Sequence, residues 1–80
     1  MQTVKSPGEI IRERLGNRRT SIEMAADSMN MMYIQLQLIV DGHIPIDEDS
    51  AVKLGLFFNT TPETWIDQQT TYSLWKEKTV

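Results

Sequence analysis

Apolar residues recur at helical spacing through most of the chain, and turn-forming residues separate the recurring segments. The central stretch, residues 21–41, begins with Ser21, whose hydroxyl can cap a helix. It holds two such segments that are joined by a tight turn near Asn30, and Gly42 follows the second. A small Ala25-Ala26 pair in the first segment would let the second segment cross it closely. Because glycine commonly ends a helix, the pattern predicts a helix-turn-helix over this stretch.

The segments on either side carry the capping signals of three more helices. Ser6 and Asp47 can cap helices that run to about Asn17 and Phe58, and a proline opens a C-terminal helix over residues 62–78. The expected order is therefore five helices with the helix-turn-helix in second and third place.

The third helix is the ambiguous element, because residues 34–38 alternate between apolar and polar side chains as a strand would. No second clear strand is available for pairing, so we expect a helix from about Met32 to Val40. The inward positions predicted for the two central helices are Met24, Ala25 and Met29 in the first and Met32, Leu36, Ile39 and Val40 in the second. Ile34 and Leu38 would then point outward.

The composition of the chain bounds its size class and location. Eighty residues without cysteine, 40% of them hydrophobic, are expected to form one all-α domain whose stability comes from packed apolar side chains. Residues 1–5 show no periodicity and should form a loose N-terminus. The chain has no apolar run of membrane-spanning length and no signal-peptide layout, so we expect a cytoplasmic protein without a membrane partner.

Charge is distributed unevenly along the chain. Residues 1–20 hold five Lys and Arg and two Glu, whereas residues 21–80 hold three Lys and nine acids, within a net charge of −3 at pH 7. Only the first quarter could therefore attract a polyanion.

The sequence offers little support for catalysis or for a bound cofactor. One histidine and no cysteine leave no recognisable nucleophile system. The acidic run Asp47-Glu48-Asp49 is better explained by capping at a helix start than by metal binding. His43 follows a turn glycine and fits a solvated loop. We therefore expect no enzyme activity, no cofactor and no metal site.

Several motifs resemble the HigA-type antitoxins, which belong to the lambda-repressor-like (XRE) class of helix-turn-helix proteins. The matching residues run in register from Pro7 to about Trp75: Pro7 to Glu13, then Ser21, Ala26, Gly42, Pro45, Ile46, Ala51 and Leu54, and finally Thr61, Pro62, Glu63, Trp65, Gln69, Tyr72 and Leu74. The resemblance implies a five-helix fold, a homodimer, operator DNA as a partner and an RNA-cleaving toxin of the HigB type as another.

The dimer interface is expected on the C-terminal helix, where three aromatic residues define a face at near-heptad spacing. These residues are Trp65, Tyr72 and Trp75.

Two interpretations of the helix-turn-helix remain open. If it recognises DNA, base edges would be read by Tyr33, Ile34, Gln37 and Leu38, and the DNA backbone would be held by Arg12, Arg14, Arg18, Arg19 and Ser21. The third helix nevertheless lacks the Ser, Thr and Arg residues usual in this family, and His43 and Ile44 stand where the following loop usually carries Lys or Arg. The alternative is a helix-turn-helix that has lost DNA binding and acts through protein contacts.

Overall fold

The computed structural model describes residues 4–79, which form five α-helices and no strand. The helices are α1 (Pro7–Asn17), α2 (Ile22–Ser28), α3 (Tyr33–Val40), α4 (Glu48–Phe58) and α5 (Pro62–Thr79). The all-α, five-helix prediction is confirmed. Of the predicted loose N-terminus, residues 1–3 lie outside the described part of the chain, and Val4 and Lys5 have no regular secondary structure.

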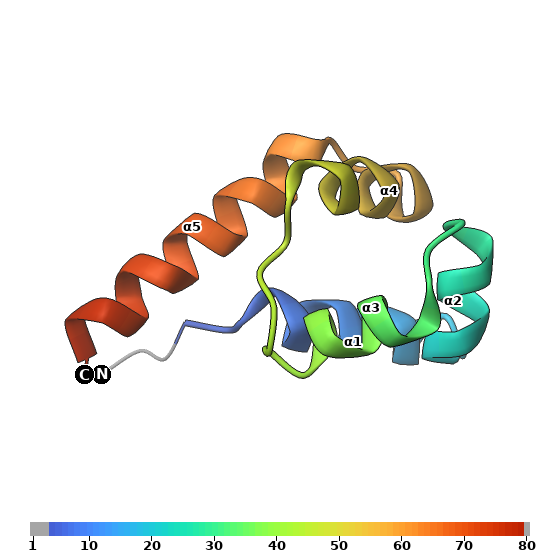
Figure 1. Cartoon of the computed structure of the whole chain (residues 1–80), viewed down its shortest axis with the longest axis horizontal. Coiled ribbons are helices and arrows are strands. Elements are labelled where there is room, and N and C mark those ends of the chain that lie inside the picture. The colour runs from blue at the N-terminus through green and yellow to red at the C-terminus, as the bar shows by residue number, and fades with distance from the viewer. Residues whose placement is uncertain (1–3, 80) are drawn as a thin grey trace.

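Figure 1 shows two groups of helices. One group contains α1, α2 and α3, and the other contains α4 and the first turns of α5, whose remaining turns extend away from the body. None of these helices is long and apolar enough to cross a lipid bilayer within residues 4–79.

Side-chain caps fix the beginnings of three helices at the residues that the sequence predicts. The Ser6 hydroxyl accepts a hydrogen bond from the Glu9 N–H at 3.2 Å, and the Asp47 carboxylate accepts one from the Ser50 N–H at 2.8 Å. Ser21 caps α2 in the same way. Each cap satisfies an N–H group that has no partner inside its helix.

The helix-turn-helix depends on a close crossing of α2 by α3. Ala25 and Ala26 are fully buried between them, and the Met31 N–H donates to the Ala26 carbonyl at 2.9 Å. Asn30 takes the left-handed backbone conformation, with φ at 55°, that reverses the chain. Tyr33 then begins α3, so the ambiguous alternating segment is a helix as predicted.

The core joins all five helices. Its buried side chains are Ile11, Leu15, Ala25, Ala26, Met29, Met31, Leu36, Ile39, Val40, Ile46, Ala51, Leu54, Phe58 and Trp65. Trp65 is 0% exposed, packs its ring 5.5 Å from that of Phe58, and donates its indole N–H to the Thr60 hydroxyl at 2.9 Å. This contact anchors the start of α5 to the end of α4.

The prediction of a buried side chain is wrong for two residues, Met24 and Met32. Met24 is 61% exposed, because α2 is short and its buried stripe is completed by Ala25, Ala26 and Met29. Met32 is 70% exposed, because it caps α3 with an extended backbone and therefore does not share the helical face of Leu36.

The assignment of Trp65 to a dimer interface is also wrong. Its side chain is enclosed within its own chain, so it has no surface to offer a second copy. Trp65 and Tyr72 do lie on one face of α5 at near-heptad spacing. That face is buried in the core at the start of the helix and reaches the surface further along, where α5 extends away from the body.

Candidate nucleic-acid interface

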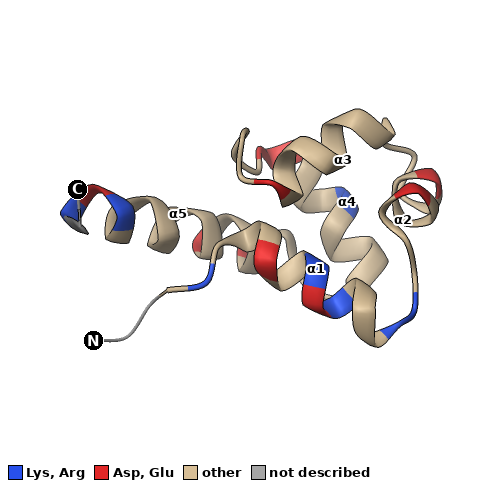
Figure 2. Ribbon diagram, turned by 90° about the horizontal axis from the view of Figure 1, so that it is seen from below, with Lys and Arg blue, Asp and Glu red and all other residues tan. Residues whose placement is uncertain are grey.

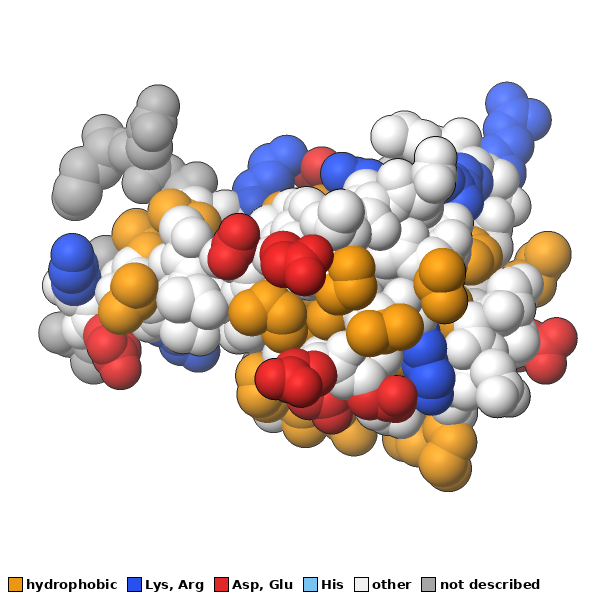
Figure 3. Space-filling model, turned by 90° about the horizontal axis from the view of Figure 1, so that it is seen from above, with side chains coloured by type: hydrophobic (Ala, Val, Ile, Leu, Met, Phe, Trp, Pro, Cys, Tyr) orange, Lys and Arg blue, Asp and Glu red, His pale blue; other side chains and the backbone are white. Residues whose placement is uncertain are grey.

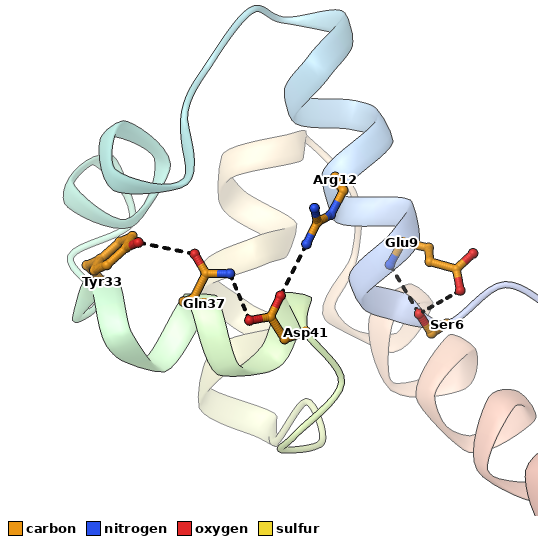
Figure 4. Close-up of polar contacts among 6 residues, drawn as sticks. All are labelled: Ser6, Glu9, Arg12, Tyr33, Gln37 and Asp41. Carbon is orange, nitrogen blue, oxygen red and sulfur yellow. Dashed lines mark hydrogen bonds and ion pairs between the residues drawn. The ribbon is translucent and has the colours of Figure 1, made fainter.

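A polar stripe runs along the outer face of α3 at four-residue spacing (Figure 4). The Tyr33 hydroxyl donates to the Gln37 amide oxygen at 3.2 Å, and the Gln37 amide nitrogen donates to the Asp41 carboxylate at 3.0 Å. Residues four apart in a helix lie one above the other, which brings these side chains into reach. Both ends of the Gln37 amide are therefore engaged within the chain.

The stripe continues onto α1 through Arg12. Its guanidinium donates to the second Asp41 oxygen at 3.2 Å, so one carboxylate receives hydrogen bonds from both helices. The ion pair is largely exposed, and exposed pairs of this kind contribute about 1 kcal/mol or less to stability. Its main effect is to orient Asp41, and through it Gln37.

The four predicted base-reading residues differ in how far they reach the surface of α3: two are exposed and two are half-buried. Ile34 is 57% exposed, Tyr33 is exposed, and Gln37 is half-buried with its amide in the polar stripe. Leu38 is half-buried, as Gln37 is, so Tyr33 and Ile34 are the two exposed members of the set. The apolar side chain most available for an outside contact on this helix is Ile34.

Two of the predicted backbone-binding arginines pack on aromatic rings of α4 and α5. The Arg14 guanidinium lies 5.7 Å from the ring centre of Phe58 and 5.6 Å from that of Trp65. Arg18 lies 5.0 Å from the Phe58 ring. Cations over aromatic faces are attracted by the ring quadrupole, so these arginines stabilise the packing of α1 on the α4–α5 pair.

Arg18 has a further contact that ties it to the end of α4. Its guanidinium donates to the Phe57 carbonyl at 3.0 Å and lies 5.3 Å from the Phe57 ring. Arg19, by contrast, is exposed and has a φ of 53° in the loop that leads to α2.

The first residue before α2, Ser21, is exposed, and its hydroxyl accepts a hydrogen bond from the Met24 N–H at 3.1 Å. A serine hydroxyl that accepts in this way keeps its own hydrogen for donation. Ser21 can therefore cap α2 and donate to an acceptor outside the chain at the same time.

The surface of the helix-turn-helix is acidic and apolar. Residues 21–41 contain no Lys or Arg, whereas Glu23, Asp27 and Asp41 are all exposed. Figure 2 shows acidic positions on α2 and basic positions on α1 and in the loop that follows it. The positive charges nearest to this surface thus belong to neighbouring segments.

Lys53 is one such charge that the sequence did not indicate. Its ammonium donates to the carbonyl of Asn30 in the turn at 3.2 Å and pairs with Asp49 at the same distance. Lys53 lies 23 residues after Asn30 in the sequence. The contact could therefore not be predicted from local spacing and becomes visible only once α4 is seen to pack against the turn. The Asp41 link to Gln37, in contrast, is visible in the sequence as four-residue spacing.

On α5, Tyr72 and Trp75 lie side by side with ring centres 5.8 Å apart, and both are half-buried. They remain the candidates for a dimer interface. The same face also borders the segment after α3, where the Gln69 amide oxygen accepts a hydrogen bond from the Ile46 N–H at 3.0 Å.

The close crossing of α2 by α3 and the exposed stripe on α3 define a helix-turn-helix protein.

No family model matches the chain. Among solved structures, an addiction module antidote protein of the HigA family from Coxiella burnetii is 32% identical, with a TM-score of 0.86 over 91% of this chain and 80% of that one.

Antitoxin HigA from Pseudomonas aeruginosa, solved with the higBA promoter, is 30% identical, with a TM-score of 0.88 over 94% of this chain and 83% of that one. The HTH-type transcriptional regulator YddM of Escherichia coli K12 is 29% identical over 75 residues, which are 92% of this chain and 80% of that protein. The chain belongs to the HigA family of antitoxins. The resemblance indicated by the motifs at Pro7 to Glu13 and Thr61 to Trp65 is confirmed.

Proposed function

We propose that the chain is an antitoxin-like transcriptional regulator that binds operator DNA as a homodimer. It neutralises an RNA-cleaving toxin of the HigB type, acts in the cytoplasm and performs no catalysis of its own. DNA binding is supported mainly by the outer face of α3, which is exposed in the helix-turn-helix. A relative of the chain from P. aeruginosa was solved with the higBA promoter.

In this proposal α3 lies in the major groove, where an α-helix can reach base edges. Gln37 presents its amide to adenine, Tyr33 offers its hydroxyl to a neighbouring acceptor or donor, and Ile34 contacts a thymine methyl group. Gln37 must release one of its contacts to Tyr33 or Asp41 to do so. Leu38 widens the same apolar contact with the part of its side chain that is exposed.

The DNA backbone is held by the loop before α2 and by the outer side of α1. The Ser21 hydroxyl donates to a phosphate oxygen, and Arg19 supplies an exposed charge in the same loop. Arg12 adds a second charge from α1. Arg14 and Arg18 are engaged with aromatic rings, so the proposal gives them mainly a structural role.

The direct test is binding of the purified protein to the DNA immediately upstream of its own coding sequence. Specific binding is expected to be at least about a thousandfold tighter than binding to a scrambled duplex of the same composition. Affinity should fall with added salt, because phosphate contacts release counterions. Absence of binding even at low salt would contradict the proposal.

A second candidate function is favoured by one observation. The helix-turn-helix surface has no Lys or Arg between residues 21 and 41, and it exposes Met24, Met32, Tyr33 and Ile34. Met32, Tyr33 and Ile34 are consecutive, and exposed apolar residues that lie close together often mark a contact with another protein. Under this alternative, substitution of Ile34 abolishes a protein complex, and DNA affinity is negligible before and after the change.

Toxin neutralisation is tested with the protein encoded beside this chain's gene. A complex isolated by gel filtration, together with loss of RNA cleavage on adding the chain, is the expected result. If that neighbour cleaves RNA equally well with and without the chain, the antitoxin part of the proposal fails while the DNA-binding part stands.

A further inference from the structure

An open groove of about 390 Å³ lies between the first halves of α4 and α5. Its floor is apolar and is formed by Ala51, Val52, Pro62 and Ile66. Its rim carries three carboxylates, Glu48 from α4 and Glu63 and Asp67 from α5, and no Lys or Arg lines it. None of these residues belongs to the helix-turn-helix.

Apolar surface is exposed along the α4 side of this groove. Val52, which lines the groove, is 45% exposed, and Leu56, one turn further along the same helix and outside the groove lining, is 81% exposed. Figure 3 shows apolar side chains lying between groups of acidic ones on this face of the molecule, with a basic side chain beside the lower acidic group. An apolar strip of this kind with charged borders is typical of a surface that another polypeptide covers.

The ion pairs found among residues 4–79 do not include Glu48, Glu63 or Asp67. Lys53 on α4 is bound to Asp49 and to the Asn30 carbonyl, and it does not line the groove. No group of three acidic or histidine side chains among the described residues is arranged to hold a metal ion. The surface therefore keeps a negative potential around an apolar floor.

These features restrict the occupant. Nucleic acid is repelled by the rim carboxylates, because its backbone carries the same sign of charge. Two copies of the chain that met groove to groove across a two-fold axis would place equal sets of carboxylates against each other, because an isologous contact pairs the same patch on both subunits. The complementary occupant is cationic and carries an apolar side chain for the floor.

We propose that the α4–α5 groove binds a cationic, amphipathic segment of another protein. Lys or Arg side chains of the segment pair with Glu48, Glu63 and Asp67, and an apolar side chain enters the groove over Val52. Because the site shares no residue with α3, it can be occupied whether or not the helix-turn-helix holds DNA, and it stands independently of the proposed function.

The test uses two synthetic helical peptides of equal length and pattern, one built from Lys and Leu and the other from Glu and Leu. Each is titrated into the isotope-labelled full chain at low salt, and amide chemical shifts are followed by NMR. The Lys and Leu peptide is expected to shift the amides of Ala51, Val52 and Ile66 and to bind at least about tenfold more tightly than the Glu and Leu peptide.

A charge-matched pair of variants tests the site itself. The triple variant Glu48→Gln, Glu63→Gln, Asp67→Asn should weaken the Lys and Leu peptide about tenfold or more, whereas Glu23→Gln, Glu77→Gln, Asp27→Asn, with the same change in net charge, should leave its affinity within about twofold. Because Glu48 and Glu63 lie in first helical turns and their loss could disturb folding, Val52→Ser provides a second variant, with an expected weakening of about threefold to tenfold.

Three results would overturn the proposal. One is equal weakening by both triple variants, which would show attraction to net charge alone. Another is a set of shifts centred on α2 and α3, which would place the binding surface there. A third is movement of the Val52 and Ile66 resonances on dilution without peptide, which would identify a second copy of the chain as the occupant.

Discussion

Gly8 of α1 packs so closely on the end of α3 that a β-carbon at this position would collide with the carbonyl oxygen of Val40. It would also lie 2.8 Å from the carbonyl oxygen of Ile39, which is backbone and cannot rotate away. Gly8→Ala should therefore lower the free energy of unfolding by about 1–3 kcal/mol, the usual cost of overpacking, as measured by urea denaturation.

Gly16 provides the matched control in the same helix. A β-carbon there meets no atom within 4 Å, so Gly16→Ala relieves the entropy cost of a helical glycine and should raise the free energy of unfolding by up to about 1 kcal/mol. If both substitutions lowered the free energy of unfolding by a similar amount, the cause would lie within α1 and not in its contact with α3.

Arg14 and Arg19 are expected to act on different properties. Arg14→Ala removes the guanidinium from the rings of Phe58 and Trp65 and should cost about 1 kcal/mol of stability in a denaturant titration, with the salt dependence of DNA binding unchanged. Arg19→Ala should leave stability within about 0.5 kcal/mol and reduce the slope of log affinity against log salt by about 1. If Arg14→Ala reduced the salt slope and Arg19→Ala reduced stability, Arg14 would be the residue that faces the DNA.

Asp47 should make stability depend on pH in the acid range. Hydrogen bonds from Ser50 lower the pKa of the Asp47 carboxylate below its ordinary value of 3.8. A lowered folded-state pKa means that this stabilisation is complete above the unfolded pKa and is lost as the pH falls through the folded one.

The variant Asp47→Ala removes the cap of α4 and should cost about 1 kcal/mol at neutral pH. The difference from the unsubstituted chain should shrink as the pH falls below 3.8, which thermal unfolding at several pH values would detect. A difference that stays constant down to the lowest pH would assign the loss to packing.

The chain is expected to be a dimer at micromolar concentrations, through Tyr72 and Trp75 on the part of α5 that leaves the body. Replacing Tyr72 and Trp75 with Ala should shift the monomer–dimer equilibrium toward monomer in sedimentation experiments. Trp65→Phe is the control, because this core substitution should reduce stability without changing the oligomeric state. A monomer at high micromolar concentration for the unsubstituted chain would refute the dimer.

The helix boundaries could be predicted because residues next to each helix end determine where the helix begins. Ser6, Ser21 and Asp47 are capping residues next to the N–H groups that they satisfy, and the structure confirms each of them. The burial of Leu36, Ile39 and Val40 followed equally from their spacing along one helix. Local signals of this kind require no knowledge of the neighbouring helices.

The site was harder to predict because side-chain partners come from distant segments. The sequence shows four arginines near the N-terminus, but the stacking of Arg14 on Trp65 spans 51 positions and depends on how α1 packs against α5. Met32 was misplaced because one residue of uncertainty at the start of a helix changes the side on which a side chain lies. Trp65 was misplaced because spacing cannot tell a core position from an interface position on a helix that leaves the body.

The outer face of α3 is proposed to read DNA, and substitution of Ile34 is the sharpest test of this role. Fluorescence anisotropy would compare the unsubstituted chain with Ile34→Ser on the upstream DNA of its own gene and on a scrambled duplex. Ile34 is 57% exposed, so the substitution should change the free energy of unfolding by no more than about 0.5 kcal/mol. The variant is expected to keep its affinity for the scrambled duplex and to lose about tenfold in preference for the upstream DNA, because a thymine methyl contact is lost. Equal affinity of the unsubstituted chain for both duplexes, with loss of a protein complex in the variant, would contradict this role.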